Sequence, residues 1–149
     1  MRPSDGLALG QRRVGETEPL GWATTVADVR RYAAEARSTD VLGRLGLTAR
    51  QHHLPVDGPP WNGFPGEELM PGELFLGGIA TCAVELLQMF ARDDGLPLGE
   101  VHVDVRAEVD PEHQPHSGRT VFNRVGMRFS VHGLPQAKAE ELVERFKGR

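Results

Sequence analysis

A long apolar segment in the middle of the chain restricts the possible folds more than any other feature. From Pro71 onward, hydrophobic side chains keep helical spacing for about five turns: Leu74, Phe75, Ile79, Cys82, Ala83, Leu86, Leu87 and Phe90. Proline is tolerated at the first position of a helix, and the run Asp93-Asp94-Gly95-Leu96-Pro97 ends it. We therefore predict one long helix with the single cysteine, Cys82, in its buried middle.

Two adjacent glycines, Gly77 and Gly78, lie inside this predicted helix. A glycine in a helix costs roughly 1 kcal/mol relative to alanine, and its lack of a side chain allows another backbone to approach closely. We expect a neighbouring element to pack against this face, and an isolated monomer to be unstable without it.

Strand-like alternation of apolar and polar residues flanks the helix on both sides. Before it, a short strand over residues 32–37 and a second strand that begins at Leu45 and runs toward His53 are predicted to form a hairpin, and residues 56–66 are predicted to form a loop. After it, residues 101–109 and 121–131 alternate as two further strands, and Pro135 begins a last amphipathic helix. This order indicates an α+β fold rather than a regular alternation of strands and helices.

Composition and charge limit the class of protein. A length of 149 residues suits one domain, which we place at residues 22–149 after a mobile tail at residues 1–21. The net charge of −4 argues against a nucleic-acid partner. No uninterrupted apolar run reaches the roughly 18 residues of a membrane span, and the amino terminus lacks a secretory signal. With one cysteine, no internal disulfide is possible, and we expect a cytoplasmic protein.

The run from Pro71 to Cys82, Pro-Gly-Glu-Leu-Phe-Leu-Gly-Gly-Ile-Ala-Thr-Cys, resembles the helix motif of the OsmC/Ohr family of osmotically inducible and organic hydroperoxide resistance proteins. Its proline and cysteine are eleven positions apart, and the loop residues Asp57-Gly-Pro59 precede it as in the family. The similarity extends from about Tyr32 to the end of the chain. It implies an OsmC-like fold, an antiparallel sheet wrapped on a long central cysteine-bearing helix, and an intertwined homodimer.

The resemblance also implies a thiol-dependent peroxidase that reduces organic hydroperoxides. In the family, the helix cysteine attacks the peroxide while an arginine and a glutamate hold the thiolate, which assigns Cys82, Arg37 and Glu73 here, with Arg44 as the second choice of arginine. The glutamate that follows the motif proline in the family falls on Gly72 in this chain. The family's second, resolving cysteine has no counterpart, so the expected reaction takes a small apolar hydroperoxide and an external thiol reductant.

A second hypothesis keeps the same fold without the chemistry. Free cysteines are often structural, and a buried thiol has a raised pKa and is inert. Cys82 would then be a core residue of a non-catalytic, dimeric binding or stress-associated protein. The bulky residues Trp61, Phe64 and Met70 fit either hypothesis, because they would line a pocket for an apolar peroxide or pack in a dimer core.

Metal binding is a weak alternative. His52 and His53 are adjacent on a predicted strand, so their side chains point to opposite faces. His113 and His116 share one polar loop without further ligands nearby. We expect no metal, no cofactor and no membrane partner.

Overall fold

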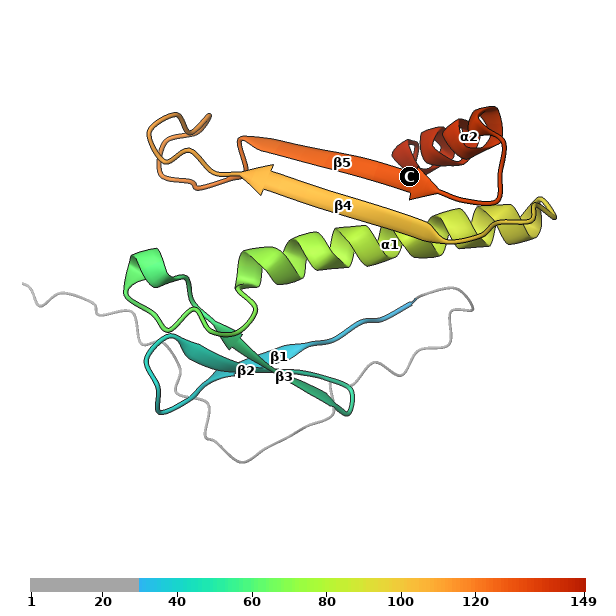
Figure 1. Ribbon diagram of the computed structural model, residues 1–149. Coiled ribbons are helices and arrows are strands. Elements are labelled where there is room, and N and C mark those ends of the chain that lie inside the picture. Colours follow the sequence, from blue (N-terminus) through green and yellow to red (C-terminus); the bar gives the residue numbers. More distant parts are fainter. Residues whose placement is uncertain (1–29) are drawn as a thin grey trace, which may run out of the picture. The chain divides into compact units, whose positions relative to one another are not determined.

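The computed structural model describes residues 30–149, and two antiparallel sheets and two helices follow one another along this part of the chain (Figure 1). Ala33–Arg149 form one compact unit. The predicted tail at residues 1–21 and the start of the predicted domain at residue 22 lie outside the described residues, so both boundaries stay predictions.

The first sheet has three strands where the sequence predicted two. Strands β1 (Glu35–Ser38), β2 (Arg44–Ala49) and β3 (His52–Asp57) pair in that order, each antiparallel to the next. A two-residue turn containing Arg50, whose φ is 56°, separates β2 from β3. This turn divides the predicted second strand, which ran from Leu45 toward His53, into β2 and the start of β3, and Pro55 concealed the rest of β3. Proline lacks the amide donor of a ladder and is tolerated on an edge strand, which is the position of β3 in this sheet.

Helix α1 (Pro71–Asp93) begins and ends where the sequence predicted. Pro71 opens it, and the Glu73 carboxylate accepts a hydrogen bond from the Met70 amide at 2.8 Å. At the other end, Gly95 adopts a φ of 66°, which allows the chain to reverse. Its fully buried residues, Ala83, Leu87, Phe90 and Ala91, all lie in the carboxyl-terminal half of the helix.

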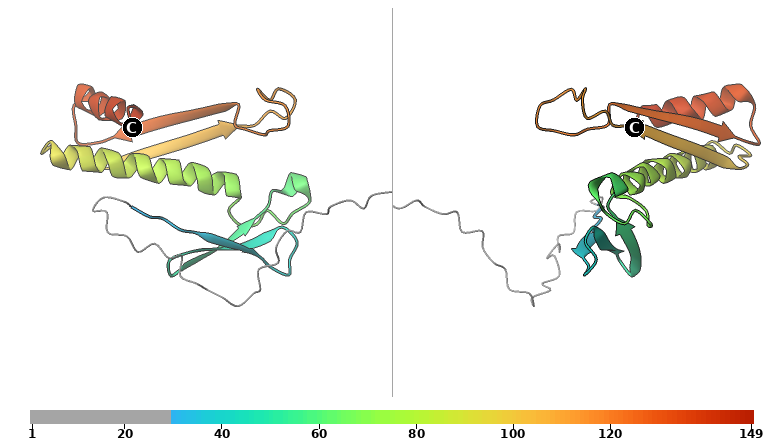
Figure 2. Two further views of the ribbon diagram at one scale, coloured as in Figure 1. Left: turned by 180° about the vertical axis from the view of Figure 1, so that it is seen from behind. Right: turned by 60° about the vertical axis from the view of Figure 1, so that its left-hand side comes forward.

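The second sheet is a hairpin of β4 (Val101–Glu108) and β5 (Arg124–Val131), and it lies alongside α1 (Figures 1 and 2). Prediction placed the start of β5 at Val121, three residues early. The side chain of Gln114 accepts the Val121 amide at 2.7 Å, and Asn123 accepts the Asp110 amide at 2.7 Å. These side-chain bonds replace ladder bonds and keep the segment in the loop.

The core lies where α1, the hairpin and helix α2 (Gln136–Lys147) meet. Leu87 and Leu142 are almost fully buried, and the Phe129 and Phe146 rings meet edge to face at 5.6 Å. The apolar alternation of β4 points toward this core, as predicted, and leaves His102, Arg106 and Glu108 exposed.

The described chain leaves the amino-terminal half of α1 largely uncovered. Phe75 is 58% exposed, and a Cβ added to Gly77 or Gly78 would meet no atom within 4 Å, so no element of the described chain packs on the glycine pair. By length and mean hydropathy (1.7), α1 also passes the test for a membrane span, whereas the sequence analysis saw no uninterrupted apolar run of that length. A core helix of a soluble protein passes the same test, so this is weak evidence for a membrane.

Candidate functional site

Cys82 lies midway along α1, and its exposure contradicts the expectation of a buried thiol. The adjacent Ala83 is fully buried, so α1 turns Ala83 toward the core and Cys82 toward the uncovered face. The helical pattern grouped Cys82 with the apolar residues of α1, but it did not show which of them the rest of the described chain covers. Among residues 30–149, no side-chain hydrogen bond or ion pair joins Cys82 to Arg37, Arg44 or Glu73.

Arg37, the first choice for the activating arginine, lies on the exposed strand β1. Its Nε forms an ion pair with the Glu35 carboxylate two residues earlier, and the two side chains are 75% and 59% exposed. Exposed pairs of this kind contribute little to stability and exchange readily with water. Within the part of the chain that the structure describes, the Arg37 guanidinium is therefore held only by a neighbour on its own strand.

Arg44, the second choice, belongs to a more highly organised cluster. Its Nε donates to Asp57 Oδ1 at 2.9 Å and its Nη2 to Asp57 Oδ2 at 2.8 Å, while the same Nη2 reaches Glu67 Oε2 at 2.6 Å. Asp57 is fully buried and also accepts the amides of Glu67 at 3.0 Å and Glu68 at 3.2 Å. We call Arg44, Asp57, Glu67 and the Glu68 amide the Asp57 cluster.

The electrostatics of the Asp57 cluster follow from these bonds. The hydrogen bonds from Arg44, followed by those from the two amides, outweigh the effect of burial and lower the pKa of Asp57 to about 2. The same carboxylates raise the pKa of Arg44 above its ordinary value. The cluster joins β2, β3 and the segment that leads into α1, and a parallel bridge between Val56 and Leu69 reinforces it.

Sequence reasoning noted Asp57 only as part of a motif and missed its pairing with Arg44. The register of the β2–β3 hairpin places Arg44 directly opposite Asp57. The sequence signal for this pair is an arginine at the start of β2 and an aspartate at the end of β3, which meet when the two strands form a hairpin. Without β3 in the prediction, this pairing could not be inferred.

The Glu73 side chain is hydrogen-bonded to the backbone at the start of its own helix. Its carboxylate caps the first turn of α1 through the Met70 amide, which is the role expected of an acid at a helix amino terminus. Gly72, at the position of the family's motif glutamate, has open space where a side chain would begin.

The aromatic residues of the loop before α1 divide between two roles. The Phe64 ring lies directly against Gly43 and Gly58, where any side chain would collide with it. Trp61, in the short 3-10 helix η1 (Pro60–Asn62), is 78% exposed. Phe64 thus shapes the loop, and Trp61 remains on the surface of the single chain.

A hollow of about 350 Å³ lies between α1 and β4, on the helix turn that also carries Cys82. Its lining is mainly apolar, with Thr81, Glu85 and Gln88 from α1 and His102 from β4 as its polar members, and Cys82 is not part of it. In the described residues, no group of three or more metal-binding side chains converges, and the His113 ring lies against the Asp110 carboxylate at 2.8 Å.

Solved structures with the same fold include several OsmC and organic hydroperoxide resistance proteins. An OsmC-like protein from Mycoplasma pneumoniae superposes with a TM-score of 0.69 at 14% identity, over 80% of this chain and 82% of that chain. An organic hydroperoxide resistance protein from Vibrio cholerae, with captopril bound in one of its active sites, gives 0.64 at 21% identity, over 81% and 80%. OhrB of Bacillus subtilis gives 0.55 at 20% identity, over 77% and 82%.

These likenesses confirm the predicted α+β, OsmC-like fold. A search of curated protein sequences found no match. The sequence model of the family described as OsmC-like protein matches residues 64–149, which is more than half of the chain and includes α1 with Cys82. The chain therefore belongs to the OsmC-like protein family.

Proposed function

We propose that this protein is a one-cysteine, thiol-dependent peroxidase that reduces small apolar organic hydroperoxides, with Cys82 as the nucleophile. One observation carries the proposal: a member of the OsmC-like family presents its single thiol on the exposed face of the central helix, eleven residues after Pro71. A peroxide can approach a thiol in that position, whereas a sealed core thiol would be inert.

The reaction balances when an external thiol serves as the reductant and two thiol groups are oxidised for each peroxide. The Cys82 thiolate attacks one peroxide oxygen, the O–O bond breaks, and the alkoxide leaves and takes a proton from water to become the alcohol. The cysteine is then a sulfenic acid, oxidised by two electrons. One external thiol condenses with it, releasing water and forming a mixed disulfide, and a second thiol displaces Cys82 again. The sequence contains no second cysteine for this role, hence the external thiol.

The thiolate needs a nearby cation, because Cys82 is too far from the start of α1 to gain from the helix dipole. We favour Arg37 over Arg44. Arg44 already donates to two carboxylates whose negative charge offsets its own. Among residues 30–149, the ion pair of Arg37 is with the exposed Glu35 alone, and this pair can open to let the guanidinium turn toward a thiol. Glu73 would act by holding the start of the helix in place.

We further propose that the active form is a homodimer in the cytoplasm, with the uncovered face of α1 against a second copy. Phe75 is 58% exposed even though its ring stacks on that of Phe122, with 5.9 Å between the centroids. No described element covers the Gly77–Gly78 pair. Cation and thiolate would then come from different chains, which is consistent with the lack of contact between Cys82 and either arginine in one chain.

Peroxide turnover with matched variants tests the proposal. We expect the wild-type protein to consume an alkyl hydroperoxide in the presence of a small dithiol or monothiol, and Cys82→Ser to lose that activity. Thr81→Ser is the control, because it keeps the hydroxyl that donates to the Gly77 carbonyl at 2.9 Å. Equal consumption by the wild type and Cys82→Ser would overturn the proposal in favour of a non-catalytic binding protein of the same fold.

A second measurement tests the activating arginine. Alkylation of Cys82 followed against pH reports how readily its thiol ionises, and we expect the native protein to react at lower pH than the urea-unfolded protein. Arg37→Gln should shift the profile to higher pH, and Arg50→Gln in the β2–β3 turn should leave it unchanged. An unchanged profile in Arg37→Gln would exclude Arg37 as the activator.

A further inference from the structure

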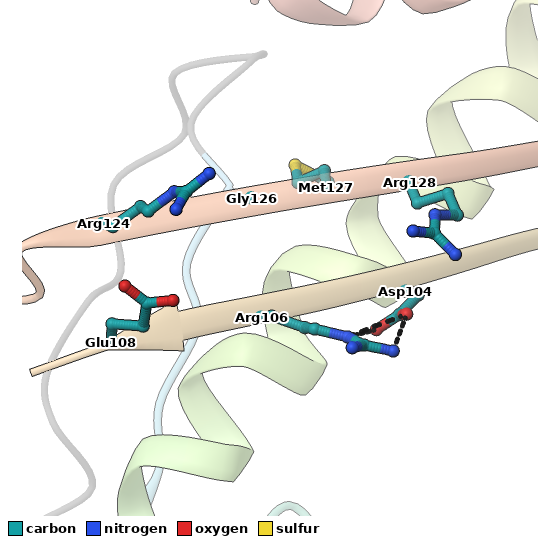
Figure 3. A pocket seen from close by; sticks show the side chains of 7 residues that line it. All are labelled: Asp104, Arg106, Glu108, Arg124, Gly126, Met127 and Arg128. Carbon is teal, nitrogen blue, oxygen red and sulfur yellow. Dashed lines mark hydrogen bonds and ion pairs between the residues drawn. The ribbon is translucent and has the colours of Figure 1, made fainter.

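A hollow of about 300 Å³ opens on the side of the β4–β5 hairpin that carries its charged residues. Six residues form most of its lining: Asp104, Arg106, Glu108, Arg124, Gly126 and Arg128. Figure 3 shows Arg124 and Arg128 on either side of Gly126 along β5, with the Arg106–Asp104 pair and Glu108 on β4. None of these residues has a part in the peroxidase proposal.

The strand register explains the shape of the hollow. Arg106 stands opposite Gly126, Asp104 opposite Arg128, and Glu108 opposite Arg124. Because alternate residues share a face, all six lie on the same side of the sheet. A Cβ added to Gly126 would meet nothing within 4 Å, so the floor of the hollow is open backbone between two arginines.

The charges of the hollow are incompletely paired. Arg106 donates to Asp104 through Nη2 at 2.8 Å and Nε at 3.1 Å, which lowers the pKa of Asp104. Within residues 30–149, neither Arg124 nor Arg128 forms a hydrogen bond or ion pair with a carboxylate, although Arg128 adds to the field at Asp104. Glu108 likewise forms no ion pair with Arg124, its partner in the register. Three guanidiniums against two carboxylates leave the hollow positive.

We propose that this hollow binds a small organic anion, with its carboxylate or phosphate group over Gly126 between Arg124 and Arg128. Guanidinium groups donate two parallel hydrogen bonds to either kind of oxyanion. The Glu108 carboxylate is left to accept a hydrogen bond from a hydroxyl or amino group on the same molecule. A long polyanion is disfavoured, because Asp104, Glu108 and the net charge of −4 repel it.

Titrations observed through the backbone amides of full-length protein test the site. The probes are sodium glycerate, glycerol phosphate and inorganic phosphate, each compared with sodium chloride at equal ionic strength. We expect amide shifts confined to β4 and β5, with glycerate or glycerol phosphate binding more tightly than inorganic phosphate because of the hydroxyl bond to Glu108. Which of the two organic probes binds more tightly distinguishes a carboxylate from a phosphate ester. Shifts no larger than those with chloride would overturn the proposal.

Glycine variants separate binding from folding. Gly126→Val places a side chain on the floor of the hollow, where its Cβ meets no protein atom within 4 Å, and valine suits a strand. We therefore expect the fold to be kept and binding to be lost. Gly46→Val is the matched control, because Gly46 is a strand glycine on β2 with equally open space. Probe affinity unchanged in Gly126→Val, or lost equally in Gly46→Val, would contradict the proposal.

Variants that remove one guanidinium measure how much each arginine contributes to probe affinity. Arg124→Gln and Arg128→Gln should each weaken binding of the best probe about tenfold, as expected for the loss of a charge-assisted hydrogen bond. Cys82→Ser should bind the probe like the wild type, so the outcome is independent of the peroxidase proposal. Full affinity in the double variant Arg124→Gln/Arg128→Gln would refute the site.

Discussion

Asp57 is the residue on which the connection between the first sheet and α1 depends. Its carboxylate is fully buried, and four hydrogen bonds from Arg44 and the amides of Glu67 and Glu68 satisfy it. In the part of the chain that the structure describes, no buried polar side-chain atom lacks a partner. Burying a carboxylate is energetically costly unless such donors satisfy it, so the fold depends on these hydrogen bonds.

The lowered pKa of Asp57 predicts an acid-sensitive fold. Because the pKa falls from 3.8 to about 2 on folding, the stability that it contributes is fully present above about pH 4 and is lost as the pH falls toward 2. Urea unfolding at a series of pH values should show this loss in the wild type. Asp57→Asn cannot ionise, so its stability should change less over the same range. Parallel curves for the two proteins would contradict the prediction.

Removing Arg44 from the Arg44–Asp57 pair should destabilise the fold more than removing the charge of Asp57. Arg44→Met leaves Asp57 buried without its cation, a kind of change that is strongly destabilising. Arg106→Met removes an arginine from an exposed pair and serves as the control. We expect a large drop in the thermal midpoint for Arg44→Met and almost none for Arg106→Met, measured by circular dichroism. Similar midpoints would mean that the Asp57 cluster does not support the fold.

Helices and strands could be predicted from the sequence where a local residue pattern alone determines their bounds. The bounds of α1 follow from Pro71 and Gly95, and β4 follows from strict alternation. Strand β3 was missed because Pro55 opposes the local preference and only its pairing with β2 settles it. The contacts of Arg44 and the exposure of Cys82 depend on the arrangement of distant segments, which a local pattern does not encode.

The two halves of α1 should respond differently to truncation. Leu87 is fully buried within the single chain, so Leu87→Ala should lower the free energy of unfolding by about 2–5 kcal/mol. Phe75 is 58% exposed and its ring stacks on Phe122, so within one chain Phe75→Ala loses that ring contact but less buried area than Leu87→Ala. Denaturant unfolding at several protein concentrations distinguishes the effects of the two substitutions. The loss of unfolding free energy in Leu87→Ala should appear at every concentration. A loss below about 1 kcal/mol for Leu87→Ala would contradict the position of the core.

At the scale of the whole molecule, one described chain buries few apolar side chains for its size. The buried hydrophobic residues are Val56, Ala83, Leu87, Phe90, Ala91, Ala139 and Leu142, and Phe75, Trp61 and Leu69 remain exposed. A domain of about 150 residues ordinarily buries more of its surface than this. Exposed apolar surface on that scale favours association, and the family fold with a second copy is the association that we propose.

Sedimentation and thiol labelling together test that association. We expect the wild type to sediment as a dimer at micromolar concentration, and Phe75→Glu, which places a charge on the uncovered face of α1, to shift it toward monomer. His116→Glu adds the same charge in the exposed β4–β5 loop and should leave the dimer intact. Because a second copy would narrow the approach to Cys82 while leaving room for a small peroxide, a bulky maleimide should react faster with Phe75→Glu than with the wild type. A stable, well-folded wild-type monomer at micromolar concentration would show that the open face of α1 is a property of the working protein. The activating cation would then have to come from the same chain as Cys82.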